Sequence, residues 1–112
     1  MASKEYTIPI KVQDIICDMV NDYNKKILSQ KTAARCIANP KGKFIYLMYI
    51  YPNDKIKRVG RLTYNSELKN MEFAIFKYRT ETYVTNKSFR GDEYLNGTIE
   101  GALKAVLKAY PI

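Results

Sequence analysis

Residues 44–51 read Phe-Ile-Tyr-Leu-Met-Tyr-Ile-Tyr, a run of apolar and aromatic side chains without a charge. The length of the run and its aromatic and β-branched side chains favour a strand. Because no polar residue alternates with the apolar ones, we expect a central strand that is covered on both faces. The run is too short for a membrane helix, which needs about 20 apolar residues. Since both sides of the strand are apolar, the pattern leaves open which side meets the helices.

Turn signals and further strand-like segments around this run predict the rest of a sheet. The turn residues Asn39-Pro40-Lys41-Gly42 precede the run, and Pro52-Asn53-Asp54 ends it. Because the connections are short, we expect the strands to be antiparallel neighbours. The last strand is expected to continue past a bulge towards Val84. The predicted strands span residues 33–38, 44–51, 56–64 and 71–78.

Two segments outside the strands have the apolar spacing of amphipathic helices. The first begins near Pro9, which suits the first turn of a helix, and the second follows Thr98, a good N-cap, and ends before Pro111. Apolar residues recur at spacings of three and four in both segments, so each helix has one face to bury. The first stripe consists of Val12, Ile15, Ile16, Met19, Val20, Tyr23 and Ile27, and the second of Ile99, Ala102, Leu103, Val106 and Tyr110.

The order helix, four strands, helix predicts a single α+β domain over residues 1–112. We expect two layers (α-β-β-β-β-α), with the N-terminal and C-terminal helices packed on one face of a four-stranded antiparallel sheet. The other sheet face would be open, and we expect function there. Residues 1–7 contain no apolar leader, and Cys17 and Cys36 lack metal-binding spacing. These features predict a cytoplasmic protein with reduced thiols and with neither metal nor cofactor.

Positive charge is concentrated in the predicted sheet. Of the 19 Lys and Arg residues, 15 fall between Lys25 and Arg90, against four Asp and Glu residues, which gives this segment a net charge of +11. The chain also contains ten Tyr and four Phe residues. A cationic surface with aromatic platforms is typical of proteins that bind single-stranded nucleic acid. A simpler interpretation is that excess lysine in turns favours solubility.

The first functional hypothesis is therefore a non-enzymatic module that binds single-stranded DNA or RNA, with low sequence specificity, on the open sheet face. The stretch Lys41-Gly42-Lys43-Phe44-Ile45-Tyr46 departs from the RNA-recognition strand motif at three successive positions, which excludes that family. The layout of strands followed by a helix resembles single-strand DNA binders of the whirly type, although no motif residue supports the resemblance. The predicted phosphate contacts are Lys57, Arg61, Lys77 and Arg79, and the predicted stacking residues are Tyr49 and Tyr51, or Tyr46 in the other register.

Two other hypotheses remain open at this stage. A protein–protein module would form a homodimer through the open sheet face and bury Phe73, Ile75 and nearby tyrosines. A metal-dependent nuclease would use carboxylates such as that of Glu72, but their spacing matches no known signature. The sequence contains no histidine, which removes the commonest general base and the commonest metal ligand. We therefore expect no enzymatic activity.

Overall fold

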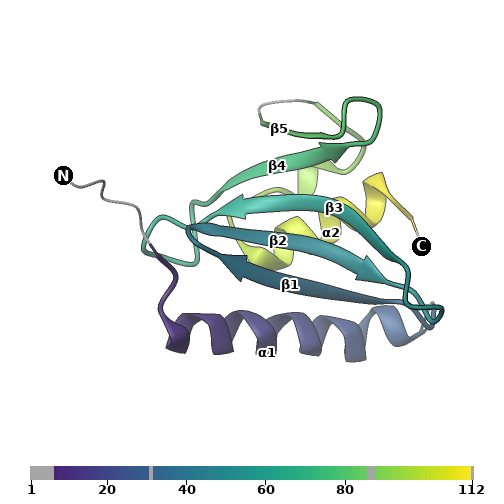
Figure 1. Cartoon of the computed structure of the whole chain (residues 1–112), viewed down its shortest axis with the longest axis horizontal. Coiled ribbons are helices and arrows are strands. Elements are labelled where there is room, and N and C mark those ends of the chain that lie inside the picture. Colours follow the sequence, from purple (N-terminus) through teal and green to yellow (C-terminus); the bar gives the residue numbers. More distant parts are fainter. Residues whose placement is uncertain (1–6, 31, 86–87, 112) are drawn as a thin grey trace.

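The computed structural model describes residues 7–30, 32–85 and 88–111. Its described residues form two α-helices, an antiparallel sheet and two short 3₁₀ turns, in the α+β arrangement that the sequence predicts (Figure 1). The helices are α1 (Ile10–Lys26) and α2 (Ile99–Ala109), and the 3₁₀ turns are η1 (Leu28–Gln30) and η2 (Asp92–Tyr94). The strands are β1 (Arg35–Lys41), β2 (Phe44–Ile50), β3 (Ile56–Thr63), β4 (Glu72–Lys77) and β5 (Thr82–Thr85).

The sheet has five strands, and the prediction of four is wrong in this respect. We expected the fourth strand to run on towards Val84, but the chain turns back after Lys77 and forms β5, which pairs antiparallel with β4. Glu81 closes this turn with a φ of 55°. No Gly, Pro, Asn or Asp occupies residues 78–81, so the turn lacks the usual sequence signal. The strand order in the sheet is β1-β2-β3-β4-β5, so each strand lies beside its neighbour in sequence.

Helix α1 lies along the β1 edge of the sheet and protects that edge. Asn24 donates from Nδ2 to the carbonyl oxygen of Cys36 at 2.8 Å, and its Oδ1 accepts from the Cys36 amide at 2.9 Å. One side chain of α1 thus satisfies both backbone groups of a residue in the edge strand. Edge strands with unpaired backbone groups invite pairing with other chains, and this amide removes part of that hazard.

Helix α2 lies behind the sheet in the view of Figure 1. Thr98 caps it as predicted, because its Oγ1 accepts a hydrogen bond from the Gly101 amide at 3.1 Å. The predicted apolar stripe is buried from Ile99 to Val106. Both helices contribute to one core with the same side of the sheet, which we call the covered face. The core includes Ile16, Val20 and Tyr23 of α1, Ile99, Ala102, Leu103 and Val106 of α2, and Ile45, Leu47, Tyr49, Val59, Leu62 and Ile75 of the sheet.

Strand β2 shows which of its two apolar sides meets the helices. Ile45 and Leu47 are 0% exposed and Tyr49 is 1% exposed, whereas the alternate residues Tyr46 and Met48 are only partly buried. The side of Ile45, Leu47 and Tyr49 therefore faces the helices. The other side of the sheet, which carries Tyr46 and Met48, is called the open face, because no described element covers it (Figure 1).

A bulge in β3 changes which basic residues share a face. Leu47 pairs with Gly60 but Met48 pairs with Arg58, so Val59 is an extra residue in the ladder. Beyond it, the alternation of β3 is reversed. Gly60, next to the bulge, is closely packed, because a Cβ atom there would lie 2.6 Å from the Phe73 ring.

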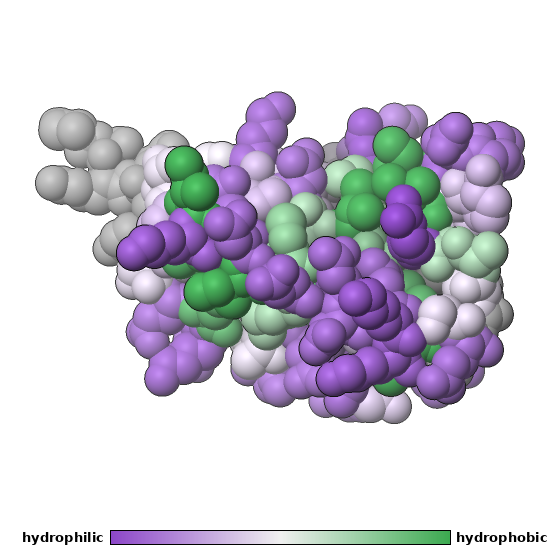
Figure 2. All heavy atoms as spheres, turned by 90° about the horizontal axis from the view of Figure 1, so that it is seen from below, coloured by the Kyte–Doolittle hydropathy of each residue, from purple (hydrophilic) through white to green (hydrophobic). Residues whose placement is uncertain are grey.

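The outer side of α1 is mostly hydrophilic, with separate hydrophobic patches (Figure 2). Its exposed apolar residues include Ile15, 47% exposed, and Met19, 36% exposed, which belong to the predicted stripe. Asp22 on this side pairs with Lys26 at 3.4 Å, as expected for a solvated helix surface. Neither described helix combines the length and the apolar character that crossing a membrane requires.

Candidate nucleic-acid interface

The open face carries a layer of aromatic side chains from three strands. The ring centroids of Tyr46 and Tyr83 lie 5.6 Å apart, and those of Phe76 and Tyr83 lie 4.9 Å apart, in edge-to-face contacts. Phe44 extends the layer, with its ring centroid 5.9 Å from that of Tyr46. Between β2 and β5, the register places Arg61 of β3 and the small Ala74 of β4 in the row of Tyr46. The result is a continuous aromatic layer across the sheet.

Two arginines of β3 lie against this aromatic layer. The Cζ atom of Arg61 is 4.3 Å from the ring centroid of Phe44 and 4.9 Å from that of Tyr83. The Cζ atom of Arg58 is 5.5 Å from the ring centroid of Phe76. Arg58 is exposed, whereas Arg61 is half-buried, and its Nε is buried without a hydrogen-bond partner among the described residues. These cation–π contacts hold two guanidinium groups on one surface.

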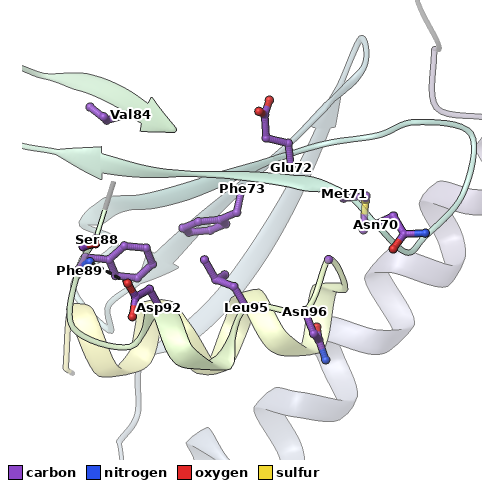
Figure 3. A pocket seen from close by; sticks show the side chains of 11 residues that line it. Asn70, Met71, Glu72, Phe73, Val84, Ser88, Phe89, Asp92, Leu95 and Asn96 are labelled. Carbon is purple, nitrogen blue, oxygen red and sulfur yellow. Dashed lines mark hydrogen bonds between the residues drawn. The ribbon is translucent and has the colours of Figure 1, made fainter. Parts of the chain in front are cut away.

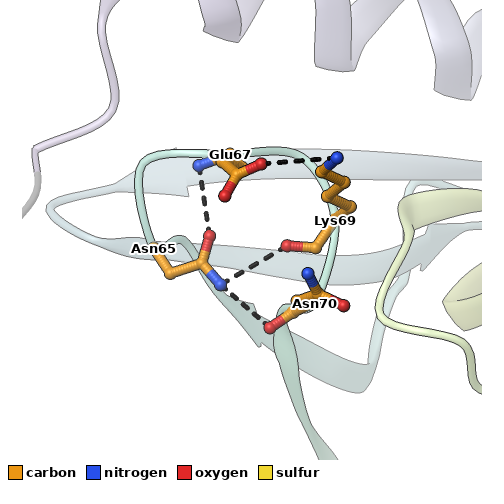
Figure 4. A network of polar contacts seen from close by, with 4 residues as sticks. All are labelled: Asn65, Glu67, Lys69 and Asn70. Carbon is orange, nitrogen blue, oxygen red and sulfur yellow. Dashed lines mark hydrogen bonds and ion pairs between the residues drawn. The ribbon is translucent and has the colours of Figure 1, made fainter.

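The open face has an excess of positive charge. The strand register places Arg35, Lys41, Arg58 and Arg61 on this face. Among the described strand residues, the only carboxylate on the same face is that of Glu72. Within the described ranges, ion pairs join Asp22 with Lys26 and Glu67 with Lys69. The first lies on α1. The second lies in the β3–β4 loop, where Asn65 organises the backbone (Figure 4). The arginines of the open face therefore have no carboxylate partner among the described residues.

Tyr83 lies close enough to Arg58 and Arg61 for both charges to affect it. Burial raises the pKa of Tyr83, and the positive charges of Arg58 and Arg61 oppose that rise only in part. Its hydroxyl group therefore stays protonated near neutral pH, where it offers a hydrogen-bond donor. The chemistry of this surface combines two guanidinium groups, a phenol and aromatic rings. All are suited to anions and to flat ring systems.

The surface is hollowed beside Arg58. A hollow of about 550 Å³ is lined by residues of β1, β2, β3 and β5 and opens to solvent. Its walls offer an amide, two cations and aromatic rings, the types of group that contact phosphates and bases. They include Asn39, Lys41, Phe44, Tyr46, Met48, Arg58 and Tyr83.

The predicted site residues are not all brought together. Arg61 lies on the open face, as expected. The prediction that Lys57 shares that face is wrong, because Lys57 pairs with Tyr49 on the covered side, and its Nζ lies 4.9 Å from the Tyr110 ring centroid. Lys77 lies on the same side of β4 as the buried Ile75, which is the covered face. The other cation, Arg79, is exposed in the turn that follows β4.

The predicted stacking residues also need correction. Tyr49 is 1% exposed in the core, so its ring is not accessible to a base. Tyr51 lies just beyond β2 and is half-buried. The structure instead has Tyr46 on the open face, which is the alternative that the sequence left open. The sequence analysis missed Arg58, Phe44 and Tyr83. The alternation in β3 would have indicated Arg58 only if the bulge were known.

A second hollow lies at the start of β4, between this strand and the segment 88–97 (Figure 3). It has a volume of about 660 Å³, and its floor contains Phe73 and Phe89 with ring centroids 5.7 Å apart. Figure 3 shows the Glu72 and Phe73 side chains on opposite sides of β4, so the Glu72 carboxylate points away from the aromatic floor. The described residues contain no group of three His, Cys, Asp or Glu side chains that would hold a metal ion. No feature of this hollow supports the nuclease hypothesis.

Comparisons of the chain with protein-family models, with curated proteins and with solved structures found no match.

Proposed function

We propose that the protein binds single-stranded nucleic acid, without catalysis, on the open face of its sheet. The observation that carries the proposal is the pair Arg58 and Arg61, held against aromatic rings without a carboxylate partner among the described residues. Unpaired guanidinium groups on a surface are suited to phosphate, which they bind with charge-assisted hydrogen bonds. The adjacent rings and the open hollow provide room for bases.

The recognition chemistry predicts low sequence specificity. Phosphate contacts are the same for every sequence, and stacking tolerates every base. Binding should therefore weaken steeply with salt, because each neutralised phosphate releases counterions. The charge of the whole chain, +8, favours association with any polyanion, so the test must separate this face from the rest of the surface.

The test compares two double variants with the same change in charge. Arg58→Glu with Arg61→Glu alters the open face, and Lys104→Glu with Lys108→Glu alters exposed positions on α2. Fluorescence anisotropy with a labelled 15-nucleotide single strand, at 50 and 200 mM salt, measures the affinity. We expect the open-face variant to lose affinity on the order of 100-fold and the α2 variant to lose only a few-fold. Equal losses would contradict a site on the open face.

A second candidate function is self-association at the apolar end of the open face. Ile56 is 59% exposed there and pairs with Ile50, next to Met48. The earlier expectation that Ile75 forms a dimer contact fails, because Ile75 is 2% exposed and faces the helices. Two open faces brought together would also oppose their arginines, which is unfavourable. Light scattering of Ile56→Asp beside the unaltered protein tests this candidate, which predicts a dimer that becomes a monomer.

A further inference from the structure

Arg58 and Arg61, the two arginines that lie against the aromatic layer, have different surroundings. Arg61 is half-buried and contacts two rings, those of Phe44 and Tyr83, at 4.3 and 4.9 Å from its Cζ. Arg58 contacts one ring, that of Phe76, at 5.5 Å, and is otherwise exposed. A guanidinium group is planar and has two faces on which a ring can stack, as well as an edge that donates hydrogen bonds. Arg58 therefore has more of its plane available to a ligand than Arg61.

The aromatic ring beneath Arg58 is poorly accessible to a base. Phe76 is 2% exposed although it belongs to the open face. The ring of Tyr78 lies against it with a centroid separation of 4.7 Å, and Tyr83 lies on another side at 4.9 Å. Tyr78 is itself fixed, because its hydroxyl donates to the carbonyl oxygen of Arg58 at 2.6 Å. Direct stacking on Phe76 would require these neighbours to move.

The guanidinium plane of Arg58 is accessible to a base, although the Phe76 ring beneath it is not. Arg58 borders the open hollow, which also presents Asn39 and Lys41. Bases stack on arginine guanidinium planes as well as on aromatic side chains. A base that enters the hollow can therefore stack on Arg58, with Phe76 supporting Arg58 from below. Lys41 is exposed at the rim, where a phosphate would lie.

We propose that Arg58 is the base-stacking residue of this surface and that Arg61 binds phosphate through its edge. The proposal rests on the proposed function and makes it more specific. Stacking on Arg58 requires a base that is not already stacked within a duplex. The ligand class is therefore a single strand with unstacked bases, and selection against duplexes arises at Arg58 rather than from the overall charge.

The experiment uses two ligands that differ only in their bases. One is a labelled 15-nucleotide thymidine strand, and the other is an abasic strand with the same number of phosphates. The variants Arg58→Lys and Arg61→Lys keep the positive charge but replace the planar guanidinium group with an ammonium group. In the unaltered protein, we expect the thymidine strand to bind on the order of 10-fold more tightly than the abasic strand, since base stacking adds to the phosphate contacts that both strands share.

The two variants should separate the two roles. Arg58→Lys should bring the ratio of the two affinities close to one, through a loss of affinity for the thymidine strand alone. Arg61→Lys should weaken both strands by a similar factor and leave the ratio unchanged. The assignment of roles is wrong if Arg58→Lys lowers the affinity for both strands equally, or if Arg61→Lys brings the ratio of the two affinities to one. A duplex of the same length binds through its phosphates alone, so Arg58→Lys, which keeps the charge, should leave the affinity for the duplex unchanged.

Failure of the inference is distinguishable from failure of the proposed function. If the unaltered protein binds both strands equally at low salt, the function stands and Arg58 stacks no base. If it binds neither strand, the proposed function fails and the inference fails with it. Melting curves check that each variant folds. If Arg58→Lys shows no melting transition, Arg58→Met takes its place. The methionine side chain can still pack on Phe76, but it has neither a planar group nor a charge. This variant must also bring the ratio of the two affinities close to one.

Discussion

The two faces of strand β2 have nearly the same composition but opposite environments. On the covered face, Ile45, Leu47 and Tyr49 are at most 1% exposed, and the helices exclude water from them. On the open face, Tyr46 is half-buried, and it lies in an aromatic layer bordered by arginines rather than by a helix. The difference shows that the character of each face depends on what packs against it, helices on one side and arginines on the other, rather than on the apolar run itself.

The ionisable groups on the two faces differ in the same way. The covered face holds Cys36 and Tyr49, which burial keeps in their neutral forms by raising their pKa values. The open face holds Arg58 and Arg61, which remain charged because guanidinium groups do not lose their protons in proteins. One face is therefore a neutral core that determines stability, and the other is a cationic surface that is open to solvent.

Substitution of neighbouring β2 residues should produce the largest contrast between the faces. Leu47→Ala on the covered face should lower the free energy of unfolding by about 2–5 kcal/mol, because it removes buried methyl groups and leaves a cavity at a 0% exposed position. Tyr46→Ala on the open face should cost roughly 1 kcal/mol, from the loss of its contact with Tyr83. Urea unfolding measures both values. Equal costs would mean that the open face is as tightly packed as the core.

Much of the fold follows from the sequence, but the division of β2 into two faces does not. Apolar spacing and turn residues predict both helices and the first four strands, and Thr98 predicts the start of α2. Both sides of β2 are apolar, however, so alternation carries no signal there. The bulge at Val59 appears only in the pairing of β3 with β2, where Leu47 pairs with Gly60 and Met48 with Arg58. For this reason the sequence indicates Lys57 where the open face has Arg58.

The sequence does not indicate the fifth strand or the position of Tyr83, for a related reason. The turn before Thr82 contains none of the residues that usually mark turns, and Glu81 adopts a positive φ without glycine. Tyr83 could be placed on the open face only once β5 was known to pair with β4. The candidate site therefore depends on two features, a bulge and an unmarked turn, that local sequence patterns do not encode.

Alkaline pH should destabilise the covered face through Cys36. Burial raises the pKa of the Cys36 thiol from 9.0 to about 12. The unfolded chain therefore releases this proton above pH 9 while the folded chain retains it, so the contribution to stability is complete below pH 9 and is lost as the pH rises towards 12. We expect this thiol to account for a loss on the order of 1 kcal/mol between pH 8 and pH 10. Urea unfolding at both pH values measures it.

The matched control for Cys36 is the other cysteine. Cys36→Ala should lower stability at pH 8 and reduce the further loss at pH 10, whereas Cys17→Ala should follow the unaltered protein, because Cys17 is exposed. A thiol reagent should also label one cysteine in the folded protein and both in denaturant. Rapid labelling of both thiols under native conditions would show that the covered face opens readily.

The smallest expected effect concerns a single hydroxyl group on the covered face. The Tyr49 hydroxyl is buried and has no hydrogen-bond partner among the described residues. Tyr49→Phe should therefore leave the free energy of unfolding unchanged or raise it by about 1 kcal/mol, since an unpaired buried hydroxyl is costly. Tyr110→Phe provides the contrast. The Tyr110 hydroxyl donates to the carbonyl oxygen of Phe76, so its removal should cost about 0.5–1.5 kcal/mol. If Tyr49→Phe destabilises the protein as much as Tyr110→Phe does, the Tyr49 hydroxyl has a partner in solution, and the covered face is less dry than its packing indicates.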